Sequence, residues 1–170
     1  MFLAVVLDVY SRKVVGWSMN ANMTAQLVID ALLMAIWRRG KPIELLHHSD
    51  QGSQYTSEDF QRLLTAQGVT CSLSRKGDCW DNAPSEAFFK TLKTELMDGG
   101  KAFSSRQEAK AAIFEYVEVF YNRKRLHSSL GNLTPVEFEE ATSGGSPSTT
   151  YPEKTRLRPA TKAVSEASTA

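Results

Sequence analysis

Cysteine is almost absent from this sequence of 170 residues, which has only Cys71 and Cys79. Two such widely spaced cysteines cannot form a disulfide framework or a zinc site, and they favour a reducing, cytosolic setting. The sequence also lacks an excess of charge of either sign, because its net charge is +1. No overall field therefore draws the chain to nucleic acid or to a membrane, and any such binding depends on local patches.

Long hydrophobic runs are missing as well. The longest apolar run, residues 1–7, has no basic segment before it and stops at Asp8. We interpret it as a β-strand, which excludes a signal peptide or a membrane span and predicts no membrane partner. The length and the 42% content of hydrophobic residues are typical of one soluble globular domain.

Short apolar runs alternate with segments of helical periodicity over residues 1–141. We expect strands at 2–9, 13–19, 43–49 and 69–73, and helices at 24–39, 57–67 and 83–97, followed by one that begins after Ser105 and one that begins after Thr134. The helix after Ser105 has the predicted apolar stripe Ala109, Ala112, Ile113, Tyr116, Val117 and Phe120. The order of these elements predicts an α/β domain with a mixed sheet.

The composition changes after residue 141. Of the 29 residues in 142–170, 11 are Ser or Thr and three are Pro, while large apolar residues are rare. Such a segment buries too little surface to offset the entropy lost on ordering. We therefore expect a folded domain over 1–141 and a disordered Ser/Thr/Pro-rich tail over 142–170.

One carboxylate, Asp50, stands where the third predicted strand ends, in the stretch HHSDQGSQYTS. Asp, Gly and Ser form turns for reasons of backbone geometry alone, so the stretch is explained by a turn without any site. The alternative is that Asp50 is half of a metal site.

A second carboxylate, Glu86, follows Asp50 after 35 intervening residues, in the first turn of the helix at 83–97. On a helical wheel Lys90 and Lys93 lie within about 40° of Glu86. The apolar residues Phe88, Phe89, Leu92 and Leu96 fall on a different face. Carboxylates suit Mg²⁺ and neighbouring lysines suit a phosphodiester, although charged pairs at this spacing also decorate ordinary solvated helices.

Four stretches together give the chain a resemblance to a known family: LAVVLDVYSRKVVGW, HHSDQGSQYTS, SRKGDCWDNAPSEAFFKTLKTE and FYNRKRLHSSLGNLTPVEF. In this order they resemble the integrase catalytic core of bacterial insertion-sequence transposases, which are related to retroviral integrases and have a ribonuclease H-like fold. The resemblance covers most of residues 1–141. It implies transposition of DNA by Mg²⁺- or Mn²⁺-dependent phosphodiester hydrolysis and strand transfer at element ends.

The family uses an Asp, Asp, Glu triad that binds two metal ions, and its last two members are typically 35 residues apart. The resemblance therefore implies that Asp50 is the second triad residue and Glu86 the third, and that Lys90 and Lys93 contact DNA ends. It also implies a homo-oligomer on DNA, in the bacterial cytoplasm and at the nucleoid when DNA is bound.

The family's first Asp lies on the first, central strand of the sheet in an Asp-x-Thr type motif, and nothing in this chain matches that motif. Asp8 is the only upstream candidate, but LDVYSR matches the family's second strand, where the Asp is not a ligand. We therefore expect a sheet without its first strand and a truncated copy that is inactive by itself. The rival hypotheses are a non-catalytic remnant that binds DNA or oligomerises, and a ribonuclease H-like nuclease of another kind, against which LHSSLGNLTPVEF speaks.

Further residues are candidates for binding DNA or supporting the site. The candidates for phosphate contacts are Arg75, Lys76, Arg123, Lys124 and Arg125, with a solvated basic loop as the alternative. Supporting roles are expected for His48, which precedes Asp50 by two positions, for Asn82 and for His127. Asn122, Arg125 and His127 match the family's YNxxRxH signature, which supports either the core or DNA binding.

Overall fold

The computed structural model describes residues 1–40, 45–49, 52, 54–73, 83–97, 103–143 and 155–163. For Leu45, His48, Ser49, Leu73, Ser143 and residues 155–163 it describes the backbone alone.

The strands are β1 (Phe2–Asp8), β2 (Val14–Asn20), β3 (Leu45–Ser49), β4 (Val69–Leu73) and β5 (Thr155–Ala163). The α-helices are α1 (Ala25–Arg38), α2 (Glu58–Ala66), α3 (Ala83–Leu96), α4 (Arg106–Phe114) and α5 (Pro135–Ser143). A π-helix η3 (Glu115–Tyr121) continues α4, and a short 3₁₀ helix η4 (Ser128–Leu130) follows.

The five strands form one mixed sheet in the order β2-β1-β5-β3-β4. β1 and β2 are an antiparallel hairpin, whereas β3 and β4 are parallel. The prediction of an α/β domain with a mixed sheet is therefore confirmed. Every strand and helix expected from periodicity forms, and the ends that lie among the described residues differ from the expected ones by at most one residue.

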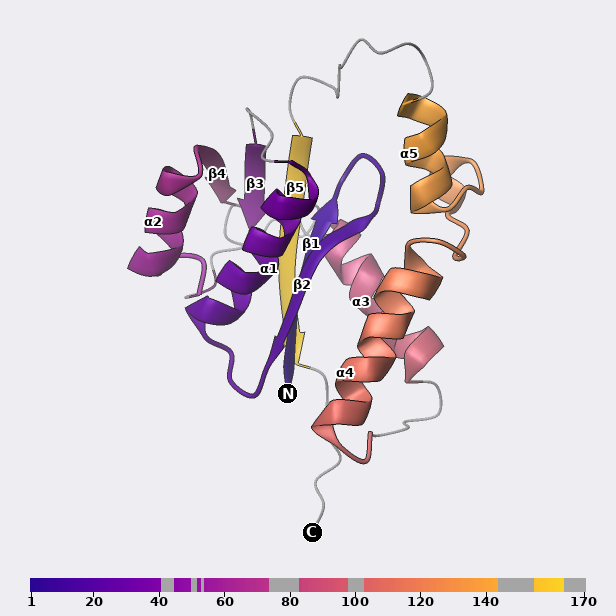
Figure 1. Ribbon diagram of the computed structural model, residues 1–170, viewed down its shortest axis with the longest axis horizontal. Helices are drawn as coiled ribbons and strands as arrows, with labels where there is room; N and C mark the ends of the chain where they lie inside the picture. The colour runs from indigo at the N-terminus through magenta and orange to yellow at the C-terminus, as the bar shows by residue number, and fades with distance from the viewer. Residues whose placement is uncertain are drawn as a thin grey trace.

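β5 lies in the middle of the sheet, between β1 and β3 (Figure 1). It runs antiparallel to β1 along the whole of that strand, from Ala163 opposite Phe2 to Leu157 opposite Asp8. It runs parallel to β3, with Leu45 opposite Thr155 and His47 opposite Leu157. The central position, where the sequence analysis expects a missing strand, is therefore filled from the C-terminal part of the chain.

This placement differs from the expectation of a disordered tail over 142–170. The segment TRLRPATKA has three basic residues, a proline and one large apolar residue, so its composition does not favour a strand. Its backbone instead pairs on both sides, with β1 and with the first residues of β3. Pairing with β3 ends at Leu157, two residues before Pro159, which has no N–H to donate.

Helices cover both faces of the sheet, as expected from the uniformly apolar β1 (Figure 1). On one face Ala4 and Val6 of β1 pack in a core with α1 and α2. On the other face Leu3, Val5 and Leu7 pack with α3, α4 and η3. The close approach of α1 to β2 requires Gly16, because a Cβ there would lie 2.1 Å from the carbonyl oxygen of Ala31.

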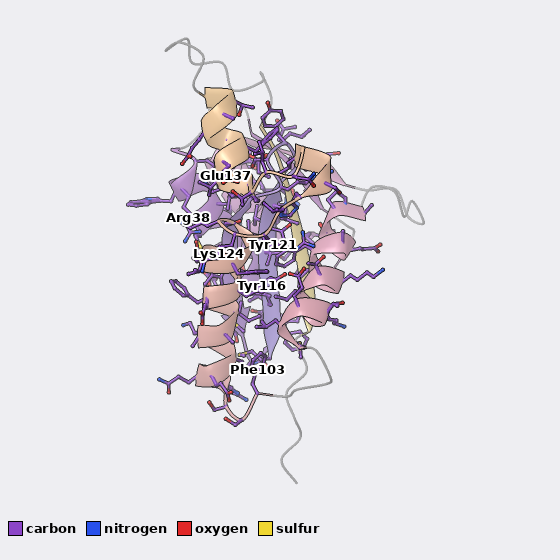
Figure 2. The ribbon with its side chains drawn as sticks, turned by 90° about the vertical axis from the view of Figure 1, so that its right-hand side faces the viewer. Arg38, Phe103, Tyr116, Tyr121, Lys124 and Glu137 are labelled. Atoms are coloured by element: carbon purple, nitrogen blue, oxygen red, sulfur yellow. The ribbon has the colours of Figure 1, made fainter. Side chains whose placement is uncertain are left out.

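The π-helix shifts the apolar stripe of the α4–η3 segment by one position. In η3 the main chain bonds five residues apart, as from Asn122 N to Val117 O. Tyr121 is therefore buried, at 5% exposure, while Phe120 is 39% exposed. The prediction that Phe120 belongs to the core stripe is wrong for this reason. Figure 2 shows Tyr116 and Tyr121 between this helical segment and α3.

Asp8 has a structural role in the turn after β1. Its Oδ1 accepts hydrogen bonds from the N–H groups of Tyr10 (2.9 Å) and Ser11 (3.2 Å). Its Oδ2 forms a buried ion pair with Arg39 at 2.8 Å, and Arg39 also binds Glu139 of α5. Asp8 is 3% exposed. These contacts account for the carboxylate fully and tie the hairpin turn to α1 and α5.

Candidate functional site

Glu86 lies in the first turn of α3 and is exposed. Lys90 and Lys93 are exposed on the same helix, while Phe88, Phe89 and Leu92 are buried against the sheet. The predicted separation of α3 into a packing face and a charged face is confirmed. Within the part of the chain that the structure describes, the Glu86 carboxylate has no hydrogen bond or ion pair.

Asp50 itself lies outside the described residues, as do Arg75, Lys76 and Asn82. The structure does describe β3, which ends at Ser49, the residue directly before Asp50. β3 pairs with β4 along its whole length and with β5 over its first three residues, so it is an inner strand of the sheet. The backbone of His48 lies opposite Ser72 of β4.

The neighbouring histidine, His47, is part of the core. It is fully buried, and its ring packs against Phe60 of α2 with centroids 5.3 Å apart and near Tyr55 at 6.3 Å. His47 of the HHSD stretch is therefore a residue of the core on the α2 side of the sheet.

The basic residues after η3 divide into two kinds. Arg123 and Lys124 are exposed, and Figure 2 labels Lys124. Arg125 instead binds Glu95 of α3, with 2.9 Å between Nε and Oε1, and its guanidinium carbon lies 6.0 Å from the centroid of the Tyr121 ring. Glu95 also accepts a 2.8 Å hydrogen bond from the hydroxyl of Tyr116, so it joins α3 to this segment at two points. Burial and this carboxylate raise the pKa of the Tyr116 hydroxyl.

Asn122 and His127 of the YNxxRxH signature are buried. The side chain of Asn122 binds the main chain of Val14 in β2, which is a structural role. The ring of His127 packs edge-on against Tyr121, with centroids 5.0 Å apart. Burial, followed by the charges of Arg125 and Arg12, lowers the pKa of His127 to about 4, so that the ring is neutral at pH 7.

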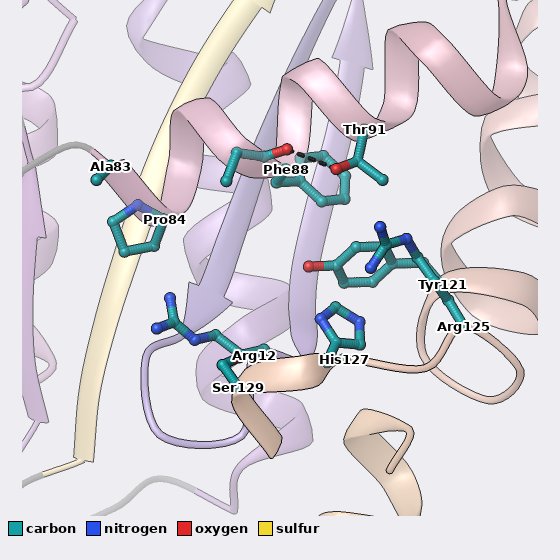
Figure 3. A pocket seen from close by; sticks show the side chains of 10 residues that line it. Arg12, Ala83, Pro84, Phe88, Thr91, Tyr121, Arg125, His127 and Ser129 are labelled. Atoms are coloured by element: carbon teal, nitrogen blue, oxygen red, sulfur yellow. Dashed lines mark hydrogen bonds between the residues drawn. The ribbon is translucent and has the colours of Figure 1, made fainter. Parts of the chain in front are cut away.

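A pocket of about 400 Å³ opens beside α3 and His127 (Figure 3). Its lining comes from three parts of the chain: the β1–β2 turn, the first half of α3 and the segment from η3 to η4. The lining residues are Arg12, Ala83, Pro84, Ala87, Phe88, Thr91, Tyr121, Arg125, His127 and Ser129.

Sequence reasoning named Arg125 and His127 but missed the other polar residues of this pocket, Arg12, Thr91, Tyr121 and Ser129. The π-helix that turns Tyr121 inward leaves no signature in hydrophobic periodicity, which assumes 3.6 residues per turn. Arg12 has a φ of 60° in the hairpin turn, and that conformation is not evident from its residue type.

The described residues contain no group of three or more His, Cys, Asp or Glu side chains placed to hold a metal ion. Among the same residues, no helix is long and apolar enough to cross a membrane.

Comparison with solved structures identifies the class of fold. The chain is similar to a chain in the cryo-EM structure of the simian T-cell lymphotropic virus intasome in complex with the PP2A regulatory subunit B56 gamma, at a TM-score of 0.64 and 20% identity over 87% of this chain and 49% of that chain. It is also similar to the HTLV-2 integrase catalytic core domain solved in complex with magnesium, at a TM-score of 0.54 and 19% identity over 78% of this chain and 81% of that one. The fold is ribonuclease H-like, as predicted.

Sequence comparison identifies the family. Two family models, each described as "Integrase core domain", match residues 1–79 and 86–142. The chain is 49% identical over 139 residues to transposase InsF for insertion sequence IS3A of Escherichia coli K12, covering 82% of this chain and 48% of the relative. It is 47% identical over 140 residues to the transposase for IS904 of Lactococcus lactis, covering 82% and 55%. The chain belongs to the integrase core family of insertion-sequence transposases, and it spans about half the length of these relatives.

Proposed function

We propose that this chain is the core of an insertion-sequence transposase and that Asp50 and Glu86 bind Mg²⁺ or Mn²⁺ in a two-ion site. The observation that carries the proposal is the Glu86 carboxylate, which is exposed in the first turn of α3 and uses no hydrogen bond or ion pair among the described residues. Two comparisons support the proposal. The chain is 49% identical to a transposase, and its fold is similar to that of an integrase core domain solved in complex with magnesium.

The residues present suit a divalent cation. Both Asp50 and Glu86 supply hard oxygen ligands, and Asp50 directly follows the last residue of an inner strand. Ions bound there would activate the attacking oxygen and stabilise the leaving oxygen in an in-line displacement at phosphorus. The substrate is DNA, first cleaved by water to free a 3′-hydroxyl and then joined to target DNA by that hydroxyl.

The lysines of α3 would hold the DNA for this reaction. Lys90 and Lys93 are exposed on the Glu86 side of the helix, where their charges can neutralise backbone phosphates. Arg75, Lys76, Arg123 and Lys124 extend the proposed contacts, and His48 and Asn82 support the site. The active assembly is a homo-oligomer on paired DNA ends, associated with the nucleoid.

The 170 residues by themselves lack a third carboxylate at the centre of the sheet. By resemblance the family's first Asp belongs to the central strand, and here β5 occupies that position. The sequence of β5, TRLRPATKA, contains neither Asp nor Glu. We infer that these 170 residues have no strand-transfer activity of their own. The same observation favours the second candidate function, a non-catalytic remnant that binds DNA.

Binding of Mn²⁺, measured by titration calorimetry, tests the site. Glu86→Gln should lower the affinity at least tenfold, because a neutral amide replaces a charged ligand. Glu115→Gln, which neutralises an exposed glutamate of η3, is the matched control and should bind Mn²⁺ as the unchanged chain does. Equal affinities for all three proteins would refute the assignment of Glu86.

A strand-transfer assay separates the two candidate functions. We expect the unchanged chain to give no product with Mg²⁺ and a duplex carrying its element's terminal sequence. A product would contradict the inferred inactivity while supporting the transposase assignment. Binding of the same duplex in EDTA, without any metal-dependent product, would support the non-catalytic remnant.

A further inference from the structure

The pocket between α3, Arg12 and His127 lies on a different side of α3 from the proposed metal site. Ala83, Ala87 and Thr91, each four residues apart, line the pocket. Glu86, Lys90 and Lys93 are not part of the lining and are centred about 100° further around the helix. A ligand in this pocket would therefore bind at a site separate from Glu86.

Polar groups without partners converge on this pocket. His127 is 9% exposed, and its Nε2 has no hydrogen-bond partner in the described part of the chain. The hydroxyl of Tyr121 points into the space between α3 and the side chains of Arg12, Ser129 and His127 (Figure 3). Among the described residues, the Tyr121 and Ser129 hydroxyls and the Arg12 guanidinium likewise have no hydrogen-bond partner.

The charge at the pocket is positive. Arg12 and Arg125 both line it, and each acts electrostatically on Tyr121 and His127. Among the described residues, the one carboxylate that acts on the same two residues is Glu95, which is already bound to Arg125 at 2.9 Å. The N-terminal residues of α3, Ala83 and Pro84, form part of the wall. The positive end of a helix dipole adds to the attraction for an anion.

We propose that this pocket binds a phosphate group, held by Arg12 and by the hydroxyls of Tyr121 and Ser129, beside the imidazole ring of His127. A guanidinium with hydroxyl donors is a usual set of partners for phosphate oxygens. The phosphate is either free in solution or part of a DNA backbone, and the choice of DNA rests on the proposed function.

His127 gives the pocket a specific response to its ligand. The His127 ring lines the pocket, and its buried Nε2 has no hydrogen-bond partner among the described residues. Burial and the charges of Arg125 and Arg12 keep the ring neutral, against the opposing effects of Glu95 and of a hydrogen bond to the backbone of Tyr121. A bound phosphate supplies negative charge beside the ring, so His127 takes up a proton on binding.

Inorganic phosphate is the first probe, with the full chain in EDTA. NMR titration of the imidazole C–H signals follows His127, one of three histidines, and the His127→Gln spectrum identifies its signal. We expect saturable shifts and a raised pKa of His127 in phosphate. Tyr121→Phe, which removes one hydroxyl and keeps the ring, should weaken phosphate binding by about three- to tenfold. Arg12→Asn should weaken it by about tenfold or more, and Asn accepts the positive φ of this position.

Lys110→Gln is the matched control, because it removes one exposed positive charge from α4 at a residue outside the pocket. It should bind phosphate as the unchanged chain does. No effect of phosphate on the His127 signal, or equal weakening by Lys110→Gln and Arg12→Asn, would overturn the proposal.

DNA binding at several salt concentrations distinguishes the two sources of phosphate. If the ligand is a backbone phosphate, Arg12→Asn should reduce the slope of log K against log salt by about 0.9, while Lys110→Gln leaves it unchanged. If the variant loses only the response to inorganic phosphate, the site binds free phosphate. The phosphate titration and the DNA-binding measurement are both done in EDTA with Glu86 unchanged. Their results therefore do not depend on the proposed metal site.

Discussion

The carboxamide of Asn122 binds both main-chain polar groups of Val14. Its Oδ1 accepts a hydrogen bond from the Val14 N–H at 2.9 Å, and its Nδ2 donates to the Val14 carbonyl oxygen at 3.0 Å. Both residues are buried. The side chain thereby pairs with the outer edge of β2 as a neighbouring strand would, and it attaches the end of η3 to the sheet.

Asn122→Ala should lower the free energy of unfolding by about 3 kcal/mol, because it leaves a buried N–H and a buried carbonyl without partners. Urea unfolding followed by circular dichroism measures the change. Asn22→Ala, at an exposed position before α1, is the control and should change stability by no more than about 0.5 kcal/mol. Equal effects of the two substitutions would show that the Asn122 bonds contribute little.

Asp8→Asn tests the structural role of the turn after β1. Asparagine keeps an oxygen for the N–H groups of Tyr10 and Ser11 but removes the charge that faces buried Arg39. We expect a loss of about 3 kcal/mol in the free energy of unfolding, since breaking a buried ion pair leaves a charge poorly compensated. Mn²⁺ affinity, measured on the folded variant, should not change. A loss of Mn²⁺ binding would instead make Asp8 a metal ligand.

Removal of β5 tests its place in the centre of the sheet. A chain that ends at residue 143 loses the strand that pairs with β1 and β3. It should unfold at lower urea concentration and with a broader transition, because buried main-chain groups of both strands lose their partners. A chain that ends at residue 163 keeps β5 and should unfold as the unchanged chain does. Identical unfolding of the two shortened chains would contradict the pairing.

The stability of the chain should depend on pH through His127. The pKa of His127 is about 4 in the folded chain and near its ordinary value of 6.5 in the unfolded chain. Between these values the unfolded state binds more protons, so the stabilising contribution is complete above pH 6.5 and is lost as the pH falls toward 4. One proton gives a slope of at most about 1.4 kcal/mol per pH unit.

Urea unfolding between pH 7 and pH 4.5 measures this dependence. His127→Gln should flatten the curve relative to the unchanged chain, whatever its absolute stability. Phosphate in the buffer should also flatten it, because a ligand that raises the folded-state pKa reduces the difference in bound protons. Parallel curves for the two proteins would show that His127 does not titrate in this range.

Local sequence signals predicted most of the elements. Helix caps are an example: Ser105 accepts from the N–H of Glu108 at 3.1 Å, and Thr134 and Glu137 exchange the reciprocal bonds of a capping box. These bonds are formed between residues three apart, so the sequence contains all the information needed. The charged face of α3 was predictable for the same reason, since the helical repeat alone separates Glu86 from Phe88 and Phe89.

By itself the sequence determined the α/β class, the buried strand β1, the helix boundaries and the separation of Glu86 from the packing face of α3. Only the tertiary structure decided which segment fills the centre of the sheet, because β5 is held by backbone pairing with β1 and β3, which are distant in the chain, and not by a pattern of its own. The pocket depended on tertiary structure as well. Its Arg12, Tyr121 and His127 come from a hairpin turn, a π-helix and the loop that follows it, and only packing brings them together.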